Sequence, residues 1–202
     1  MNYIKKKPEY KLPILSYLLL ITSIYILRLF LGWDTAFIIG AVLMLVIPFL
    51  IRRDLNFFYY DSSGFIKGLG ISIIILIIYI VVLFMYSRLN AGHLSIREFG
   101  ISFLLIQFFL VAIPEEVFFR GYLQKCLGND YKAIIIVSIL FAIAHLIIVC
   151  AITGGINVCA QNALTFFPSL IMGYLFMKTT TIWSSVVFHF LANVVHILIY
   201  IR

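Results

Sequence analysis

Long apolar runs separated by short polar segments dominate the pattern of this 202-residue chain. A helix needs about 20 mostly apolar residues to cross the hydrocarbon core of a bilayer. Seven runs approach or reach that length, and the second and sixth are the shortest. They cover residues 12–32, 35–51, 65–87, 100–123, 133–153, 161–178 and 180–201. The pattern predicts an all-α fold, a polytopic transmembrane helical bundle of about seven spans.

Composition excludes a soluble protein. The chain is 64% hydrophobic and 11% charged, whereas a soluble domain carries about 25% charged residues. No polar domain, long linker or internal repeat separates the spans, so we expect a single integral membrane domain with the lipid bilayer as its solvent. The first apolar run has no small-residue cleavage site behind it and is predicted to be a retained span rather than a signal peptide.

The net charge of +7 does not indicate a nucleic-acid partner, because the basic residues lie in short loops between spans. With the N-terminus inside, ten Lys and Arg fall on the inner side and three on the outer side, the bias typical of membrane topology. The inner set is Lys5, Lys6, Lys7, Lys11, Arg52, Arg53, Lys67, Lys125, Lys132 and Lys178. The outer set is Arg88, Arg97 and Arg202. We therefore expect a cytoplasmic N-terminus and an outer C-terminus.

Polar residues concentrate in the last four spans. Residues 1–99 are predicted to be transmembrane scaffold helices, in which Arg28, near the outer end of its span, is expected to reach the headgroups. Residues 100–202 are predicted to be the catalytic transmembrane core. His93 lies in an outer loop and is expected to be exposed to solvent.

Two adjacent carboxylates, Glu115 and Glu116, lie inside the fourth span. Each costs roughly 2.5–3.5 kcal/mol at a helix centre on insertion scales, and intramembrane charges are usually functional. Glu116 and Arg120 are four residues apart, so they share a helical face and are predicted to form an ion pair. Glu115 has no such partner in the sequence and is the candidate general base. Pro114 frees the carbonyl of Leu110 and predicts a kink with room for water.

Further polar residues lie at a similar depth in two later spans. Glu115 and His189 are each about nine residues, roughly 14 Å, from the inner ends of their helices, and His145 is about 18 Å in. The three side chains are therefore expected to converge on one cavity, together with Asn193, which is one turn from His189. His196 on the same face is predicted to be structural, and Phe118, Phe119 and Phe141 are predicted to pack.

Metal and disulfide chemistry remain open alternatives. No HExxH or CxxC pattern is present, but Glu115, His145 and His189 form a possible three-ligand zinc set. Cys150 and Cys159 flank a short loop and can pair if it faces an oxidising side. The preferred interpretation is three unpaired thiols, Cys126, Cys150 and Cys159, in apolar surroundings.

The segments PEEVFFRGYL, FAIAHL and FHFLANVV, in this order, resemble the CAAX-protease and bacteriocin-processing family, also called the Abi or type II CAAX prenyl endopeptidase family. Its EExxxR, FxxxH and HxxxN motifs match Glu115, Glu116 and Arg120; Phe141 and His145; and His189 and Asn193. The resemblance covers roughly residues 100–200. It implies a glutamate-dependent intramembrane peptidase without a cofactor, acting on a peptide or membrane-anchored protein.

The resemblance also implies roles. Glu115 and His145 would activate the attacking water, His189 and Asn193 would stabilise the oxyanion, and Glu116 with Arg120 would fix the geometry. A prenylated CAAX protein, a pheromone, a bacteriocin or a leader peptide are possible substrates. The Ile-, Phe-, Tyr- and Lys-rich composition favours a bacterial plasma membrane. Alternatives are a zinc-dependent form of the protease, a non-catalytic bacteriocin-immunity or peptide-binding protein, and a proton-coupled transporter.

Overall fold

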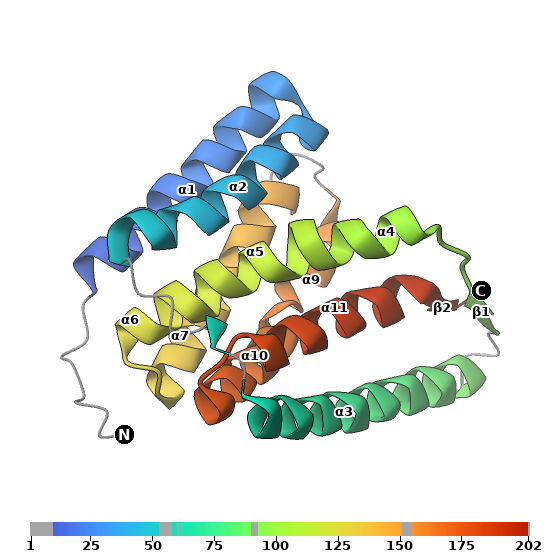
Figure 1. The fold of residues 1–202 in the computed structure, drawn as a ribbon. Coiled ribbons are helices and arrows are strands. Elements are labelled where there is room, and N and C mark those ends of the chain that lie inside the picture. Colours follow the sequence, from blue (N-terminus) through green and yellow to red (C-terminus); the bar gives the residue numbers. More distant parts are fainter. Residues whose placement is uncertain (1–9, 53–57, 60, 90–92, 151–154, 202) are drawn as a thin grey trace.

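The computed structural model describes residues 10–52, 58–59, 61–89, 93–150 and 155–201. They form an all-helical bundle with one small two-stranded sheet (Figure 1). Six helices are long and apolar enough to cross a membrane, and the shorter apolar α11 (Trp183–Leu198) is the seventh. The six are α1 (Lys11–Leu31), α2 (Trp33–Arg52), α3 (Ser62–Leu89), Ile101–Leu127, Tyr131–Cys150 and Ile156–Thr179. The predicted polytopic transmembrane bundle is confirmed.

The fourth, fifth and sixth spans are composite helices. The fourth runs through α4 (Ile101–Ile106), η2 (Gln107–Ala112), α5 (Ile113–Glu116), η3 (Val117–Gln124) and α6 (Lys125–Leu127). The fifth joins α7 (Tyr131–His145) to η4 (Leu146–Cys150). The sixth joins α9 (Ile156–Ala163) to α10 (Phe166–Thr179).

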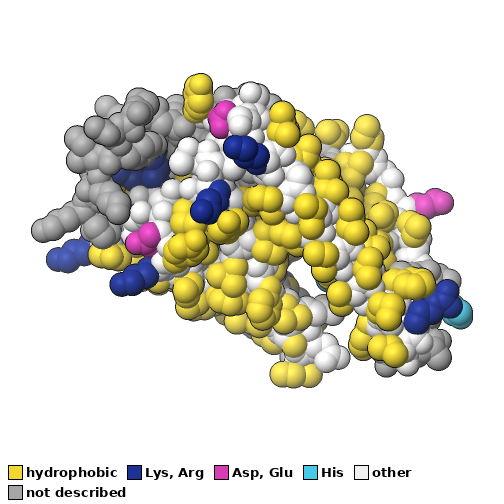
Figure 2. All heavy atoms as spheres, turned by 90° about the horizontal axis from the view of Figure 1, so that it is seen from below, with side chains coloured by type: hydrophobic (Ala, Val, Ile, Leu, Met, Phe, Trp, Pro, Cys, Tyr) yellow, Lys and Arg dark blue, Asp and Glu magenta, His cyan; other side chains and the backbone are white. Residues whose placement is uncertain are grey.

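The α1–α2 hairpin packs against one side of the α4–α6 helix. On the other side α11 packs against this helix, and α3 packs against α11 (Figure 1). Hydrophobic side chains cover much of the molecular surface, and the Lys and Arg side chains lie mainly towards its two ends (Figure 2). Along α3, Ile73, Ile74, Ile77 and Ile78 are all exposed. An apolar outer face flanked by charged ends is the arrangement that a bilayer requires.

The C-terminal span is shorter than the sequence predicted. Helix α11 ends at Leu198, and β2 (Ile199–Ile201) pairs antiparallel with β1 (Leu94–Ile96) from the α3–α4 connection. The prediction of a helix through residue 201 is therefore wrong. The second and sixth spans, at 20 and 24 residues, are also longer than predicted. The isoleucines at 199 and 201 alternate around Tyr200, and Ile199 takes an extended backbone (φ −102°); this β-branched pattern suits a strand.

The loop before α7 fixes where the fifth span begins. Gly128 has a positive φ of 124°, which glycine adopts without steric cost. Asp130 is the N-cap of α7, and its carboxylate accepts a hydrogen bond from Ala133 N. Gln124 Nε2 donates to Asn129 Oδ1 and to Gly173 O, both at 2.9 Å. These contacts fix the register of the helix that carries His145.

Cys150 and Cys159 form a disulfide between η4 and α9, with their Cα atoms 5.0 Å apart. The prediction of three unpaired thiols is wrong for these two residues, because the chain returns after η4 and places α9 beside it. Cys126 is buried and is not in a disulfide, and its Sγ lies 3.1 Å from Arg52 Nη1.

Helices α3 and α11 approach closely at Gly68. A Cβ atom at this buried position would overlap the Ser184 side chain. On the same helix, a Cβ at the exposed Gly70 would meet nothing within 4 Å. Small residues commonly allow such contacts between membrane helices.

We predict that Gly68→Ala destabilises the folded protein by about 1–3 kcal/mol through overpacking, whereas Gly70→Ala does not. Unfolding of both variants in the same detergent measures the difference. Equal stability of the two variants would contradict this packing.

Candidate active site

The candidate site is built where π-helical turns surround Pro114. Proline lacks a backbone N–H and cannot make the usual bond to Leu110 O. Instead of a sharp kink, the chain forms the π-helical segments η2 and η3 on either side of α5, and Ile113 N–H bonds to Phe108 O. Such wider turns are frequent at functional sites. They hold Glu115 and Glu116 in the middle of the longest composite helix.

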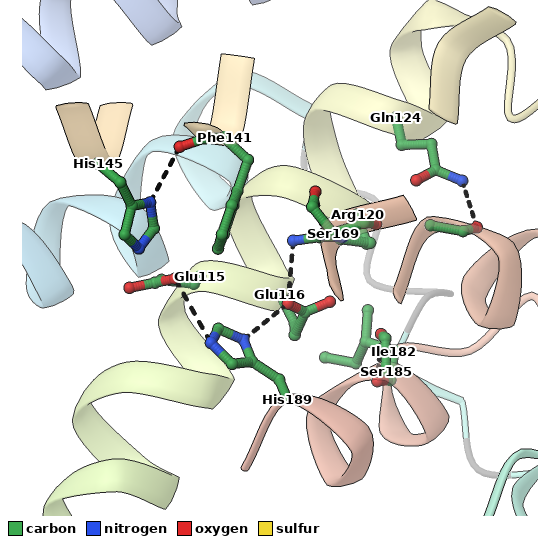
Figure 3. Close-up of polar contacts among 11 residues, drawn as sticks. Glu115, Glu116, Arg120, Gln124, Phe141, His145, Ser169, Ile182, Ser185 and His189 are labelled. Carbon is green, nitrogen blue, oxygen red and sulfur yellow. Dashed lines mark hydrogen bonds and ion pairs between the residues drawn. The ribbon is translucent and has the colours of Figure 1, made fainter. Parts of the chain in front are cut away.

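Glu116 is the centre of a buried charge cluster (Figure 3). Its Oε1 accepts from Arg120 Nη1 at 3.0 Å, which confirms the predicted ion pair, and both side chains are fully buried. The same oxygen lies 2.9 Å from His189 Nδ1. Because an ionised carboxylate only accepts hydrogen bonds, His189 Nδ1 is the donor.

Arg120 also ties the cluster to α10. Its Nη2 donates to Ser169 Oγ at 2.7 Å and to Ser169 O at 3.1 Å. The guanidinium carbon lies 4.9 Å from the centre of the Phe141 ring. Phe141 in turn contacts the His145 ring at 4.4 Å and the His189 ring at 6.0 Å between centroids. Phe118, Phe119 and Phe141 are buried, as predicted.

Glu115 is held much more loosely than Glu116. Its Oε2 is buried and has no hydrogen-bond partner among the described residues, and His189 Nε2 lies 3.8 Å away. Its side chain is 15% exposed, against 0% for Glu116. Figure 3 shows the Glu115 carboxylate between the rings of His145 and His189. Of the two carboxylates, Glu115 is therefore the one available for chemistry.

His145 has one ring nitrogen engaged. Its Nδ1 lies 2.9 Å from Phe141 O, and a carbonyl only accepts, so Nδ1 carries a proton. In the neutral form His145 can accept a hydrogen bond through Nε2.

Two cavities meet at these residues. The hairpin cavity, of about 320 Å³, lies between the α1–α2 hairpin and the fourth, fifth and last spans, and Glu115 lines it. The α10 cavity, of about 460 Å³, lies between α3, α10 and α11, and His189 lines it. Val111, His145 and Asn193 line both cavities. Apolar walls with a few convergent polar groups are typical of ligand sites.

Asn193 does not contact the glutamates. Its Nδ2 donates to Gln107 Oε1 at 3.1 Å, across from α11 to η2. His196, predicted to be structural, has its Nδ1 3.1 Å from Tyr79 Oη on α3. His93 is exposed, as predicted.

The possible zinc set of Glu115, His145 and His189 is not assembled as a metal centre. Within the described ranges, no group of three or more His, Cys, Asp or Glu side chains is arranged to hold a metal ion.

Residues 97–195 match the model of a known family, described as type II CAAX prenyl endopeptidase Rce1-like. This region, slightly under half of the chain, is therefore similar to that family. The matched region contains every motif residue described above. No match was found among curated proteins or among solved structures. At the level of the family, this match supports a CAAX-type peptidase embedded in the membrane for the Rce1-like chain.

Two contacts of the Rce1-like site were not predicted from the sequence. Gln107 lies eight residues before Glu115, and Ser169 lies on a span to which no role was assigned. The sequence signal for Gln107 was that it is a polar residue within an apolar run. Ser169 gave no comparable signal, because a serine satisfies its own hydroxyl within a helix at little cost.

We predict that Arg120→Lys destabilises this Rce1-like protein by about 1.5–3 kcal/mol, the contribution of a hydrogen bond to a charged group. Lysine retains the charge but cannot bind Glu116 and Ser169 with one planar fork. The matched control is Arg88→Lys, because Arg88 is exposed on α3. Unfolding midpoints of both variants measure the effect, and an unchanged midpoint for Arg120→Lys would contradict it.

Proposed function

We propose that the protein is a glutamate-dependent intramembrane peptidase in which Glu115 and His145 hold and activate the attacking water. The observation that carries this proposal is the contrast between two neighbouring carboxylates. Glu116 is bound by Arg120 and His189, whereas Glu115 Oε2 has no hydrogen-bond partner in the described part of the chain. His145 Nε2 offers a second acceptor beside it, and two acceptors suit the two hydrogens of one water.

The reaction balances on these residues. Glu115 takes a proton from the water as the water oxygen attacks the carbonyl carbon of the peptide. The electrons of the C=O double bond move to the carbonyl oxygen. Glu115 then delivers that proton to the leaving amine as the C–N bond breaks. Positioned acid–base catalysis of this kind contributes typically 10²–10⁴-fold.

His189 and Asn193 stabilise the oxyanion in this proposal. His189 donates to Glu116 through Nδ1, so donation from Nε2 requires the doubly protonated ring. Asn193 supplies an amide donor at the junction of the two cavities.

The substrate in this proposal is a peptide or membrane-anchored protein that crosses from one cavity into the other, with its scissile bond at the junction. A prenylated CAAX protein, a pheromone, a bacteriocin and a leader peptide all fit mostly apolar cavity walls. A bacterial plasma membrane with a cytoplasmic N-terminus is part of the proposal. The Cys150–Cys159 disulfide supports this orientation, because it lies on the predicted outer side, where disulfides persist.

We predict that Glu115→Gln abolishes proteolysis while the protein remains folded and inserted. Comparative peptidomics of membranes and medium, from cells carrying wild type or the variant at matched abundance, measures this. A peptide or processed terminus that disappears in the variant identifies the substrate. Indistinguishable profiles would count against an enzyme, and full bacteriocin protection by the variant would indicate a binding or immunity protein instead.

Metal independence is tested on the same substrate. We predict that cleavage by purified protein persists in excess chelator, because catalysis is assigned to Glu115 and His145 rather than to a metal-bound water. Loss of activity that added zinc restores would favour the zinc-dependent form.

Gln107 is predicted to position the Asn193 amide. Gln107→Leu should lower kcat roughly tenfold with little change in KM, since it removes one hydrogen bond worth about 0.5–1.5 kcal/mol. Asn193→Ala should lower kcat by about 10²–10³, the typical loss of an oxyanion donor. If Gln107 acts through Asn193, the double variant should lose no more than Asn193→Ala alone.

The control for Gln107→Leu is Gln161→Leu, because Gln161 is exposed and lines the α10 cavity but not the hairpin cavity. Additive losses in the double variant, or equal losses in the two glutamine variants, would refute the positioning role.

A further inference from the structure

Arg28 lines the hairpin cavity together with Glu115, His145 and Asn193. It belongs to α1, outside the region that matches the family model. The prediction that this side chain reaches the headgroups stays a prediction. Its guanidinium carbon lies 4.3 Å from the centre of the Trp33 ring, and its Nη1 is buried without a hydrogen-bond partner among the described residues.

Stacking on Trp33 leaves the donors of Arg28 unused. A ring contacts the flat face of a guanidinium, whereas the N–H donors point outwards in its plane. None of the ion pairs among the described residues includes Arg28. Arg28 is permanently charged and has a buried, unpartnered N–H in an otherwise mostly apolar cavity. Such a group is complementary to a planar anion. A carboxylate accepts the two parallel hydrogen bonds that a guanidinium offers.

The hairpin cavity provides a length scale between Arg28 and the site. Its wall on α2 extends from Trp33 to Met44, about 17 Å at 1.5 Å per residue. Trp33 marks the end at Arg28. Leu45, beside Met44, packs against the cluster formed around Ala112 and Val117, which flank Glu115 in sequence. An extended peptide covers about 3.3–3.6 Å per residue, so about five residues separate the two ends.

We propose that Arg28 is a subsite for a carboxylate of the peptide substrate, about five residues from the scissile bond. The proposal rests on the proposed peptidase function. The carboxylate is either the C-terminal α-carboxylate or an Asp or Glu side chain, and both present the same planar anion to Arg28. The apolar walls between Arg28 and Glu115 accommodate the side chains between them.

The test uses purified wild type in phosphatidylcholine nanodiscs and a proteome-derived peptide library. One half of the library is native, and in the other half all carboxylates are converted to amides. New termini are identified by mass spectrometry. We expect wild type to cleave about five residues from a carboxylate, and amidation to lower cleavage of the same sequences roughly 10–100-fold.

Two variants assign this dependence to Arg28. Arg28→Gln should lose the preference for native over amidated peptides while cleaving amidated peptides as wild type does. Arg28→Lys should retain part of the preference, and it provides a second variant if Arg28→Gln folds poorly. The matched control is Arg88→Gln, which removes an exposed arginine whose guanidinium carbon lies 5.0 Å from the Phe84 ring centre, and it should behave as wild type.

The outcomes separate the two proposals. Cleavage at a fixed distance from the peptide C-terminus indicates that Arg28 binds the α-carboxylate. Cleavage at a fixed distance from Asp or Glu indicates that it binds a side-chain carboxylate. Equal cleavage of native and amidated peptides by wild type would overturn the Arg28 subsite and leave the peptidase intact. Dependence on added phosphatidylglycerol instead of peptide carboxylates would assign Arg28 to a lipid phosphate and also overturn it. Absence of cleavage in both halves would overturn both proposals.

Discussion

The rest of the structure depends on how one buried carboxylate, that of Glu116, is satisfied. A charge inside a membrane is tolerated only when its partners are in place, and removing one partner of a buried pair typically costs about 3–5 kcal/mol. Arg120 and His189 supply these partners, and Ser169 holds Arg120. Glu116 Oε1 thereby joins the fourth span to α11, and Arg120 joins the fourth span to α10. His189 is oriented before any substrate arrives.

That arrangement gives two adjacent glutamates different tasks. Residues next to each other in a helix point about 100° apart, so the pair meets different surroundings. Glu116 faces the guanidinium, and Glu115 faces the hairpin cavity and His145 (Figure 3). The same contrast links the fold to the proposed chemistry, because a carboxylate that holds the bundle together cannot also exchange protons freely.

Patterns that repeat along one helix were predictable from the sequence. The apolar runs predicted the spans, and the four-residue spacing predicted the Glu116–Arg120 ion pair. The similar depth in their helices predicted that Glu115 lies near His189. Contacts set by how helices pack were not predictable, among them Gln107 with Asn193, Ser169 with Arg120, and the Cys150–Cys159 disulfide. The terminal strand at Ile199–Ile201 was hidden because strand and helix share the same apolar residues.

The central claim is that Glu116 is structural and Glu115 is chemical, and a paired measurement on the two glutamine variants tests it most directly. Unfolding midpoint and peptide cleavage would be measured on Glu115→Gln and Glu116→Gln in the same nanodiscs. The account predicts that Glu115→Gln keeps its midpoint and loses cleavage, whereas Glu116→Gln loses about 3–5 kcal/mol of stability. Cleavage that survives in Glu115→Gln, or equal destabilisation of the two variants, would contradict it.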